Sequence, residues 1–461
     1  MVSCGLGVVA WAADGEDGGS TTPPSVVPRT PDLSLGVDAH LANYGLYYSH
    51  AFFGRAERAW LETSARLATT FQYHAVTVRA GAIGVRTSGR DPYGTGTRPA
   101  DAGPGAPRRS TEPAFDLDEA YVQLAKPGDV PVKATLGRQN LTLGSQFLIG
   151  DGVYDGFSAH SQQAVYHNPR RSFDAARLEW DAPGAHVDSF VYNVDPTWDA
   201  AGGHDGVLGG VDVSRPAAFT AGTYAGGVFY RASPSKKDND MVVGDLRVEQ
   251  HLPLLPDAYV SGEGAGEFLG TCRNAFYCTR VGQDMNEYAW HAEVGHRATG
   301  GAWKPFVEVG YVEYSKDFTP IAPGFSDWGK WYLGNTIDWI VFGTNTRVVR
   351  ADLGFWPSAT TKLRAQYFNT REATPSGTST GGTLSDEVNL ILEWYPTAWL
   401  WVNVLGGYAR PGPALARSGL SNPFGFINSG ADPVGTHDTL HAVLAVGVDY
   451  SRAILPWRNG G

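Results

Sequence analysis

The stretch that decides the fold begins ATLGRQNLTLGSQFLIGDGVYDG at residues 134–156 and continues HNPRRSFDAARLEWDAPGAHVDSFVYNV at residues 167–194. Two β-patterned segments, Leu136–Leu143 and Ala175–Val194, flank a connection that is rich in Gly, Asp and Asn. A strand, a long polar loop and a further pair of strands recur in this order along the rest of the chain. The pattern therefore predicts an all-β protein with long loops.

The second segment turns back on itself. Pro183-Gly184 is a strong turn signal. We therefore expect Asp174–Trp180 and His186–Val194 to pair as a hairpin.

Elsewhere the strands alternate between an apolar and a polar face. In Glu287–Arg297, Tyr288, Trp290 and Val294 alternate with Glu287, His291, Glu293 and Arg297. Successive side chains of a strand point to opposite faces. The first clear alternation starts at Leu33, and in strand after strand the polar face carries charged residues.

Composition separates a membrane barrel from a soluble β-sandwich or propeller. The chain of 461 residues contains 58 Gly, 14 Trp and 21 Tyr. The apolar faces mix small residues with aromatics near strand ends, which is typical of a membrane barrel and unlike a densely packed aliphatic core. No apolar run is long enough for a membrane-spanning helix. We expect one transmembrane antiparallel β-barrel over residues 33–457, of about 16–18 strands, with short periplasmic turns and long extracellular loops.

The first residues look like the end of a secretory signal. Leu6–Trp11 is apolar, and Ala10-Trp11-Ala12 fits a cleavage site with small residues, although a positively charged start is missing. We expect a truncated signal peptide over residues 1–12 and a flexible lead-in over residues 13–32; a chance apolar N-terminus is the alternative.

Three long loops are expected at residues 87–113, 195–220 and 411–437, and each is large enough to fold inward. Cys272 and Cys278 lie in another loop-like stretch and are predicted to form a disulfide in an oxidising compartment. A metal site would need further ligands beside this pair, and none flank it.

Two patches resemble a known family. The first is Gly137-Arg138-Gln139, followed by Gly150-Asp151-Gly152 and by Arg170–Asp174 with Arg177-Leu178. The second patch is Ser385–Asn389, followed by Gly407-Tyr408 and Pro411-Gly412. Together they resemble the alginate-export family of bacterial outer-membrane barrels, although much of the loop between Gly156 and Asn168 does not. The resemblance implies passage of an anionic polyuronate through a single barrel lined with basic side chains.

By motif position, the basic residues that would line the pore and bind solute are Arg138, Arg170, Arg171 and Arg177; by alternation they are Arg350, Lys362 and Arg364. Guanidinium groups suit this role because they pair with carboxylates through two hydrogen bonds. The alternative is structural: such residues can brace the wall by pairing with Asp or Glu on neighbouring strands, as expected for Arg247 between Asp245 and Glu249. A lumen of both signs departs from a uniformly basic conduit and favours a more general solute channel, or a relative adapted to another polymer.

The leading hypothesis is a passive channel in the bacterial outer membrane for an anionic or polar solute, such as a saccharide or polyuronate. The alternative is a non-conducting barrel that sheathes or anchors a partner, such as an electron-transfer protein. The net charge of −11 and the lack of a basic block argue against nucleic acid. The sequence shows no catalytic motif, so no enzymatic activity and no cofactor are expected. The expected partners are membrane lipid, lipopolysaccharide and the solute, around a monomeric barrel.

Overall fold

In the computed structural model, the residues that are described number 33–50, 53, 57–90, 114–127, 130–150, 172–194, 206–217, 221–232, 241–272, 283–284, 286–316, 318, 332–337, 345–375, 382–417, 435 and 437–457. The predicted signal peptide, the lead-in, Arg170, Arg171 and Cys278 lie outside these ranges. Cys272 ends a strand, but its side chain is not described.

Almost all of the regular structure is β-strand. The strands are β1 (Leu33–Tyr48), β2 (Arg58–Tyr73), β3 (Val76–Arg90), β4 (Ala114–Ala125), β5 (Val132–Asn140), β6 (Ser172–Ala182), β7 (Ala185–Val194), β8 (Gly206–Pro216), β9 (Gly222–Ala232), β10 (Met241–Leu252), β11 (Leu255–Cys272), β12 (Gln283–Asp284), β13 (Tyr288–Arg297), β14 (Phe306–Tyr314), β15 (Thr346–Ser358), β16 (Thr361–Glu372), β17 (Thr383–Thr397), β18 (Leu400–Pro411) and β19 (Thr439–Trp457). A short helix, α2 (Pro413–Arg417), follows β18. Among the described residues, no helix is long and apolar enough to cross a membrane.

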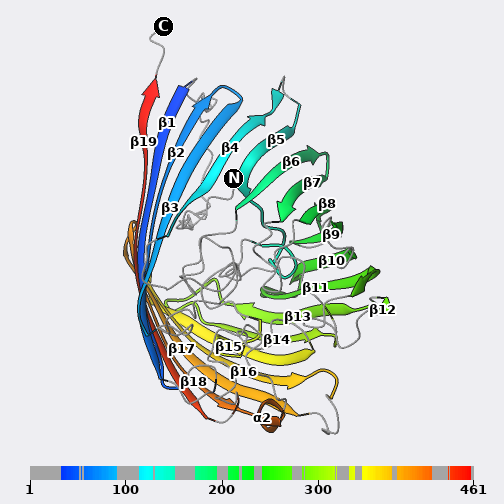
Figure 1. The fold of residues 1–461 in the computed structure, drawn as a ribbon, viewed down its shortest axis with the longest axis vertical. Helices are drawn as coiled ribbons and strands as arrows, with labels where there is room; N and C mark the ends of the chain where they lie inside the picture. The colour runs from blue at the N-terminus through cyan, green and yellow to red at the C-terminus, as the bar shows by residue number, and fades with distance from the viewer. Residues whose placement is uncertain are drawn as a thin grey trace, which may run out of the picture.

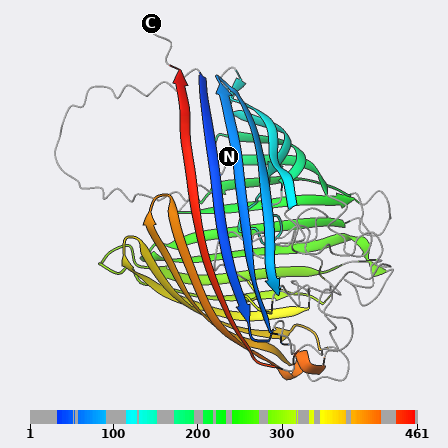
Figure 2. The same ribbon diagram turned by 60° about the vertical axis from the view of Figure 1, so that its left-hand side comes forward.

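The strands form a closed antiparallel barrel (Figure 1). Each strand pairs with its neighbours in sequence, and β1 pairs with both β2 and β19, so the ring closes between the first and last strands (Figure 2). β12 pairs only with the end of β11, which pairs directly with β13. Within the described part of the chain, eighteen strands therefore make up the barrel wall, which confirms the predicted fold class.

Short turns and long connections lie at opposite ends of the barrel. Leu33 pairs with Trp457 at the end that carries the short turns, such as the one between β6 and β7. Gly184 in this turn has a φ of +78°, which glycine adopts without strain and which confirms the hairpin predicted around it. In outer-membrane barrels the short turns are periplasmic and the long loops extracellular.

One predicted loop was wrong, because residues 195–220 contain β8. The strand was missed because its alternation is weakened by two adjacent glycines, Gly209 and Gly210. Close packing explains the glycine at position 210, because a Cβ there would lie 2.4 Å from the ring of Phe229 on the neighbouring strand β9. The large ring occupies space that a side chain on β8 would otherwise fill.

The outer face of the barrel is apolar. Large hydrophobic side chains along it are exposed to solvent in the isolated chain, including Leu136 at 69%, Leu246 at 75% and Leu390 at 62%. Trp394 and Tyr408 lie on the same face near strand ends. This arrangement is the lipid-facing band with aromatic girdles that a membrane barrel requires.

The inner face is polar toward the short-turn end, and toward the long-loop end it mixes polar with large apolar side chains. There a buried cluster combines wall residues such as Phe190 and Phe229 with loop residues such as Leu141, Phe147 and Ile337. Because the loop residues are part of this cluster, some of the long connections enter the barrel.

Candidate functional site

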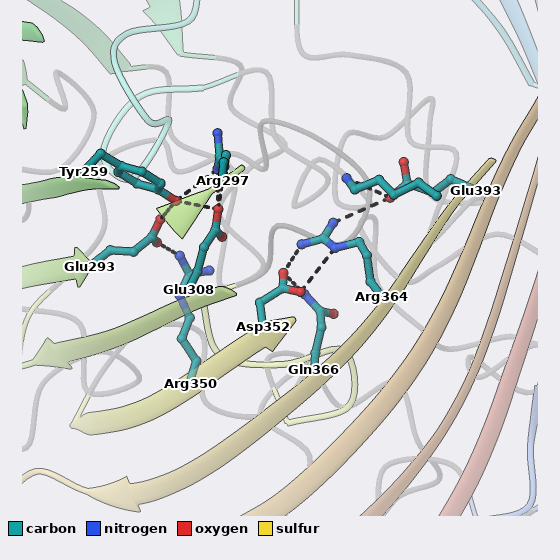
Figure 3. Close-up of polar contacts among 10 residues, drawn as sticks. Tyr259, Glu293, Arg297, Glu308, Arg350, Asp352, Arg364, Gln366 and Glu393 are labelled. Carbon is teal, nitrogen blue, oxygen red and sulfur yellow. Dashed lines mark hydrogen bonds and ion pairs between the residues drawn. The ribbon is translucent and has the colours of Figure 1, made fainter. Parts of the chain in front are cut away.

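Two networks of charged side chains cover the inner face from β11 to β17 (Figure 3). The first, called here the Tyr259 network, consists of Tyr259, Glu293, Arg297, Glu308 and Arg350. Arg297 Nε donates to Glu308 Oε1 at 2.9 Å, and Arg297 Nη2 donates to the Tyr259 hydroxyl at 3.0 Å. That hydroxyl also lies 3.1 Å from Glu293 Oε1, and Arg350 forms an ion pair with Glu293.

A glycine makes the Tyr259 network possible. Gly295 lies opposite Tyr259 in the β11–β13 register, and a Cβ there would approach the tyrosine ring to 2.4 Å. The ring can therefore lie across β13, where the Arg297 guanidinium stacks 4.8 Å from its centroid. This adds a cation–π contact to the hydrogen bonds.

The second set, called here the Arg364 network, consists of Asp352, Lys362, Arg364, Gln366 and Glu393 on β15, β16 and β17. Arg364 forms an ion pair with Asp352 and lies 3.6 Å from Glu393. Gln366 Nε2 donates to Asp352 at 3.0 Å, and Lys362 Nζ lies 3.3 Å from Glu393. Only 4% of the Arg364 side chain and 6% of the Asp352 side chain are exposed, so this pair is mainly a structural brace.

Similar ion pairs continue around the rest of the wall. They join Arg66 to Asp118 and Glu119, Arg79 to Asp38 and Glu119, Lys133 to Glu179, Arg177 to Glu179 and Asp188, and Arg247 to Asp212 and Asp245. Together with the Tyr259 and Arg364 networks, these pairs form what we call the charge belt. Its lumen surface carries both signs, with basic and acidic groups on adjacent strands.

Four predicted pore residues, Arg177, Arg350, Lys362 and Arg364, lie on this inner face and belong to the charge belt. All four are paired with carboxylates, as the bracing alternative expects, and their role toward solute stays a prediction. Arg297 was not among the predicted solute-binding residues, although its strand pattern puts it on the charged face. Its side chain is 52% exposed, against 14% for Arg350 and 19% for Lys362.

Arg138 does not line the pore, which corrects the prediction based on motif position. It shares the outward face of β5 with Leu136, and its guanidinium binds the exposed Asp174 at 3.0 and 3.1 Å. Strand alternation decides its direction, because residues two apart point to the same side.

Two loop segments enter the lumen and are called here the inward segments, residues 141–150 and 332–337. Ser145 contacts Glu263 and lies 3.4 Å from His291 Nε2, while the Tyr332 hydroxyl donates to the Ser145 carbonyl at 3.3 Å. The ring of Phe147 packs against Tyr332, with 5.2 Å between centroids. Burial raises the pKa of the Tyr332 phenol, so this group remains a hydrogen-bond donor. The inward segments narrow the lumen at the long-loop end.

Two other groups of side chains were candidates for a catalytic triad and for a metal site, and neither has the geometry or the charge that such a site needs. Ser145, His291 and Glu263 come together, but Glu263 contacts the serine rather than the far nitrogen of the histidine, which a catalytic triad requires. Glu179, His186 and Asp188 offer atoms within 4.8 Å of one another. However, Lys133 and Arg177 already neutralise the two carboxylates, so this group does not favour a metal ion.

A closed barrel with an apolar outer band and a charged inner face defines the class of protein: a bacterial outer-membrane β-barrel. A family model described as "Alginate export" matches residues 48–198, which confirms the resemblance seen in the sequence.

Solved structures of outer-membrane proteins share the fold. OccAB1 of Acinetobacter baumannii is 10% identical, with a TM-score of 0.60 over 91% of this chain and 97% of that one. Pseudomonas aeruginosa OccK2 (OpdF), solved in complex with glucuronate, is 12% identical, with a TM-score of 0.57 over 92% and 99%. OprD of the same organism is 13% identical, with a TM-score of 0.55 over 92% and 96%. A search of curated proteins finds no match.

Proposed function

We propose that the protein is a passive outer-membrane channel for anionic or polar solutes, with sugar acids as the favoured class. The observation that carries this proposal is the charge belt on the inner face of the barrel. A solute that enters a narrow passage loses part of its hydration, and fixed charges and hydrogen-bonding groups on the wall offset that loss.

Arg297 is the side chain best placed to meet the solute. It is the most exposed cation of the two networks in Figure 3, and a guanidinium can bind a carboxylate through two hydrogen bonds. The nearby Glu308 and Tyr259 can accept hydrogen bonds from hydroxyl groups. A sugar acid carries both kinds of group, so it suits a wall of both signs better than a bare polyanion does.

Two comparisons support this solute class. OccK2 binds glucuronate, a sugar acid, in its solved complex, and the matching family model is that of alginate export, where alginate is a polymer of such acids. We also propose that the barrel is monomeric and contacts lipopolysaccharide in the membrane.

Single-channel recording in a planar bilayer tests the proposal. We expect a conducting pore whose current is blocked by glucuronate more strongly than by glucose, which lacks the carboxylate. Arg297→Ala should weaken the block, whereas Arg138→Ala, which removes an arginine from the outer face, should leave it unchanged. Equal block by the two sugars would contradict the proposed solute class, and a wild-type barrel without conductance would contradict the channel.

The inward segments favour one alternative, a non-conducting barrel that sheathes or anchors a partner protein. Phe147 and Tyr332 fill space at the long-loop end in which solute would otherwise pass. Under this alternative, the purified barrel would not conduct and a partner would be recovered with it by crosslinking in cells.

A further inference from the structure

Glu387, on the inner face of β17, is completely buried, at 0% exposure. Its carboxylate is held by neutral donors. The backbone N–H of Asn335 donates to Oε1 at 2.7 Å, and that of Thr336 donates to Oε2 at 2.9 Å. The side-chain amide of Asn389 donates to Oε1 at 2.8 Å. A buried carboxylate is costly unless donors such as these satisfy it. Since two of the donors are backbone N–H groups of the inward segment 332–337, Glu387 holds that segment against the barrel wall.

Contacts around Glu387 fix the same segment to both strands at the closure of the barrel. Asn335 Nδ2 donates to the Tyr48 hydroxyl of β1 at 3.3 Å, and the Thr336 hydroxyl lies 3.2 Å from His441 Nδ1 of β19. The rings of Tyr48 and His441 stack, with 5.5 Å between centroids. The segment is thus held by several strands at once.

Two glycines leave room for this arrangement. Gly334 has a φ of +100°, and a Cβ there would lie 3.0 Å from Glu387 Oε2. A Cβ at Gly407 would lie 2.2 Å from His441 Nε2 and 2.3 Å from Asn389 Oδ1, two atoms that are themselves 3.0 Å apart. The sequence patch Ser385–Asn389 with Gly407-Tyr408 therefore has a structural purpose that the charge belt does not explain.

We propose that Glu387 is the positioning residue that fixes the inward segment 332–337 in the lumen and thereby sets the width of the passage. The docking of the segment by Glu387 does not depend on what the barrel does, whereas its effect on permeation rests on the proposed channel function.

Glu387→Gln tests the proposal, because it keeps the size of the side chain but places an N–H donor where a backbone N–H needs an acceptor. Asp386→Asn is the matched control: Asp386 is the neighbouring residue on the outer face, where it binds Tyr367 and Asn369. Amide hydrogen exchange of residues 333–337 in refolded protein should accelerate by about ten-fold or more in the Glu387 variant, the factor expected for one lost buried hydrogen bond. The control should exchange as the wild type does.

Single-channel conductance of the same samples should rise in Glu387→Gln and stay at the wild-type value in Asp386→Asn. Unchanged exchange in Glu387→Gln overturns the docking role, and faster exchange with unchanged conductance overturns the role in setting the width. A wild-type barrel that does not conduct contradicts the channel function, while the exchange data still report on docking. If Glu387→Gln does not refold, Asn389→Ala, which removes one donor to Glu387, should give a smaller acceleration of exchange in the same residues.

Discussion

Arg297 and Glu308 lie diagonally across the β13–β14 pair, with 2.9 Å between Arg297 Nε and Glu308 Oε1, and only the arginine side chain is largely exposed to the lumen. The carboxylate is 11% exposed, so solute meets mainly the cationic member of the pair. An otherwise neutral ion pair therefore presents positive charge to the passage.

Glu308→Gln should increase the preference of the channel for anions. The substitution removes the negative charge that offsets Arg297 while leaving a hydrogen-bond acceptor of the same size. The reversal potential under a salt gradient measures the effect. Arg297→Ala should shift this potential in the opposite direction, and shifts of the same sign in both variants would contradict the role of the pair.

Asp352→Ala should destabilise the barrel by about 1–3 kcal/mol, because Arg364 and Gln366 would each lose a buried hydrogen-bond partner. Urea unfolding of the refolded barrel, followed by tryptophan fluorescence, gives the free energy of unfolding. Arg297→Ala is the comparison, since its exposed side chain can be lost at smaller cost. A midpoint equal to that of the wild type would show that the Arg364 network does not brace the wall.

Leu246→Arg should cost about 2–4 kcal/mol if Leu246 lies near the middle of the bilayer, because it places a charge against lipid. Leu246 is 75% exposed on the outer face of β10. Ser261→Arg on the inner face of β11 introduces the same side chain toward the lumen and should be tolerated better. Both free energies come from unfolding in lipid vesicles, and equal costs would contradict the assignment of the two faces.

Phe147→Ala should loosen the contact between the two inward segments. The ring is 1% exposed and packs against Tyr314, Tyr332 and His291. We expect more frequent transitions between current levels in single-channel records, because the segments would lose a shared contact. Phe115→Ala, which removes a ring that is 77% exposed on the outer face, is the control. Records with unchanged noise would show that the packing of Phe147 does not limit these motions.

The sequence predicted the parts of the fold that follow from local alternation. In β13, β16 and β17, charged residues toward the lumen and apolar residues toward lipid make the period of two unmistakable. β8 was missed because its glycines carry no such pattern. The prediction for Arg138 is wrong because the family motif does not carry the parity with Leu136, which decides the direction of the side chain. Docking of the inward segments was not foreseen, because contacts such as Ser145 with Glu263 join residues far apart in the chain.

The pairing of β1 with β19 has a consequence for biogenesis. Among the described strands, β1 and β19 stand at opposite ends of the sequence, so both must reach the membrane before the wall can become continuous. Tyr48 and His441, which hold the segment 332–337, belong to these same two strands. Pairing of β1 with β19 therefore also brings together the two side chains that hold this segment. An assembly intermediate in which β1 and β19 are not yet paired would lack that binding site for the segment.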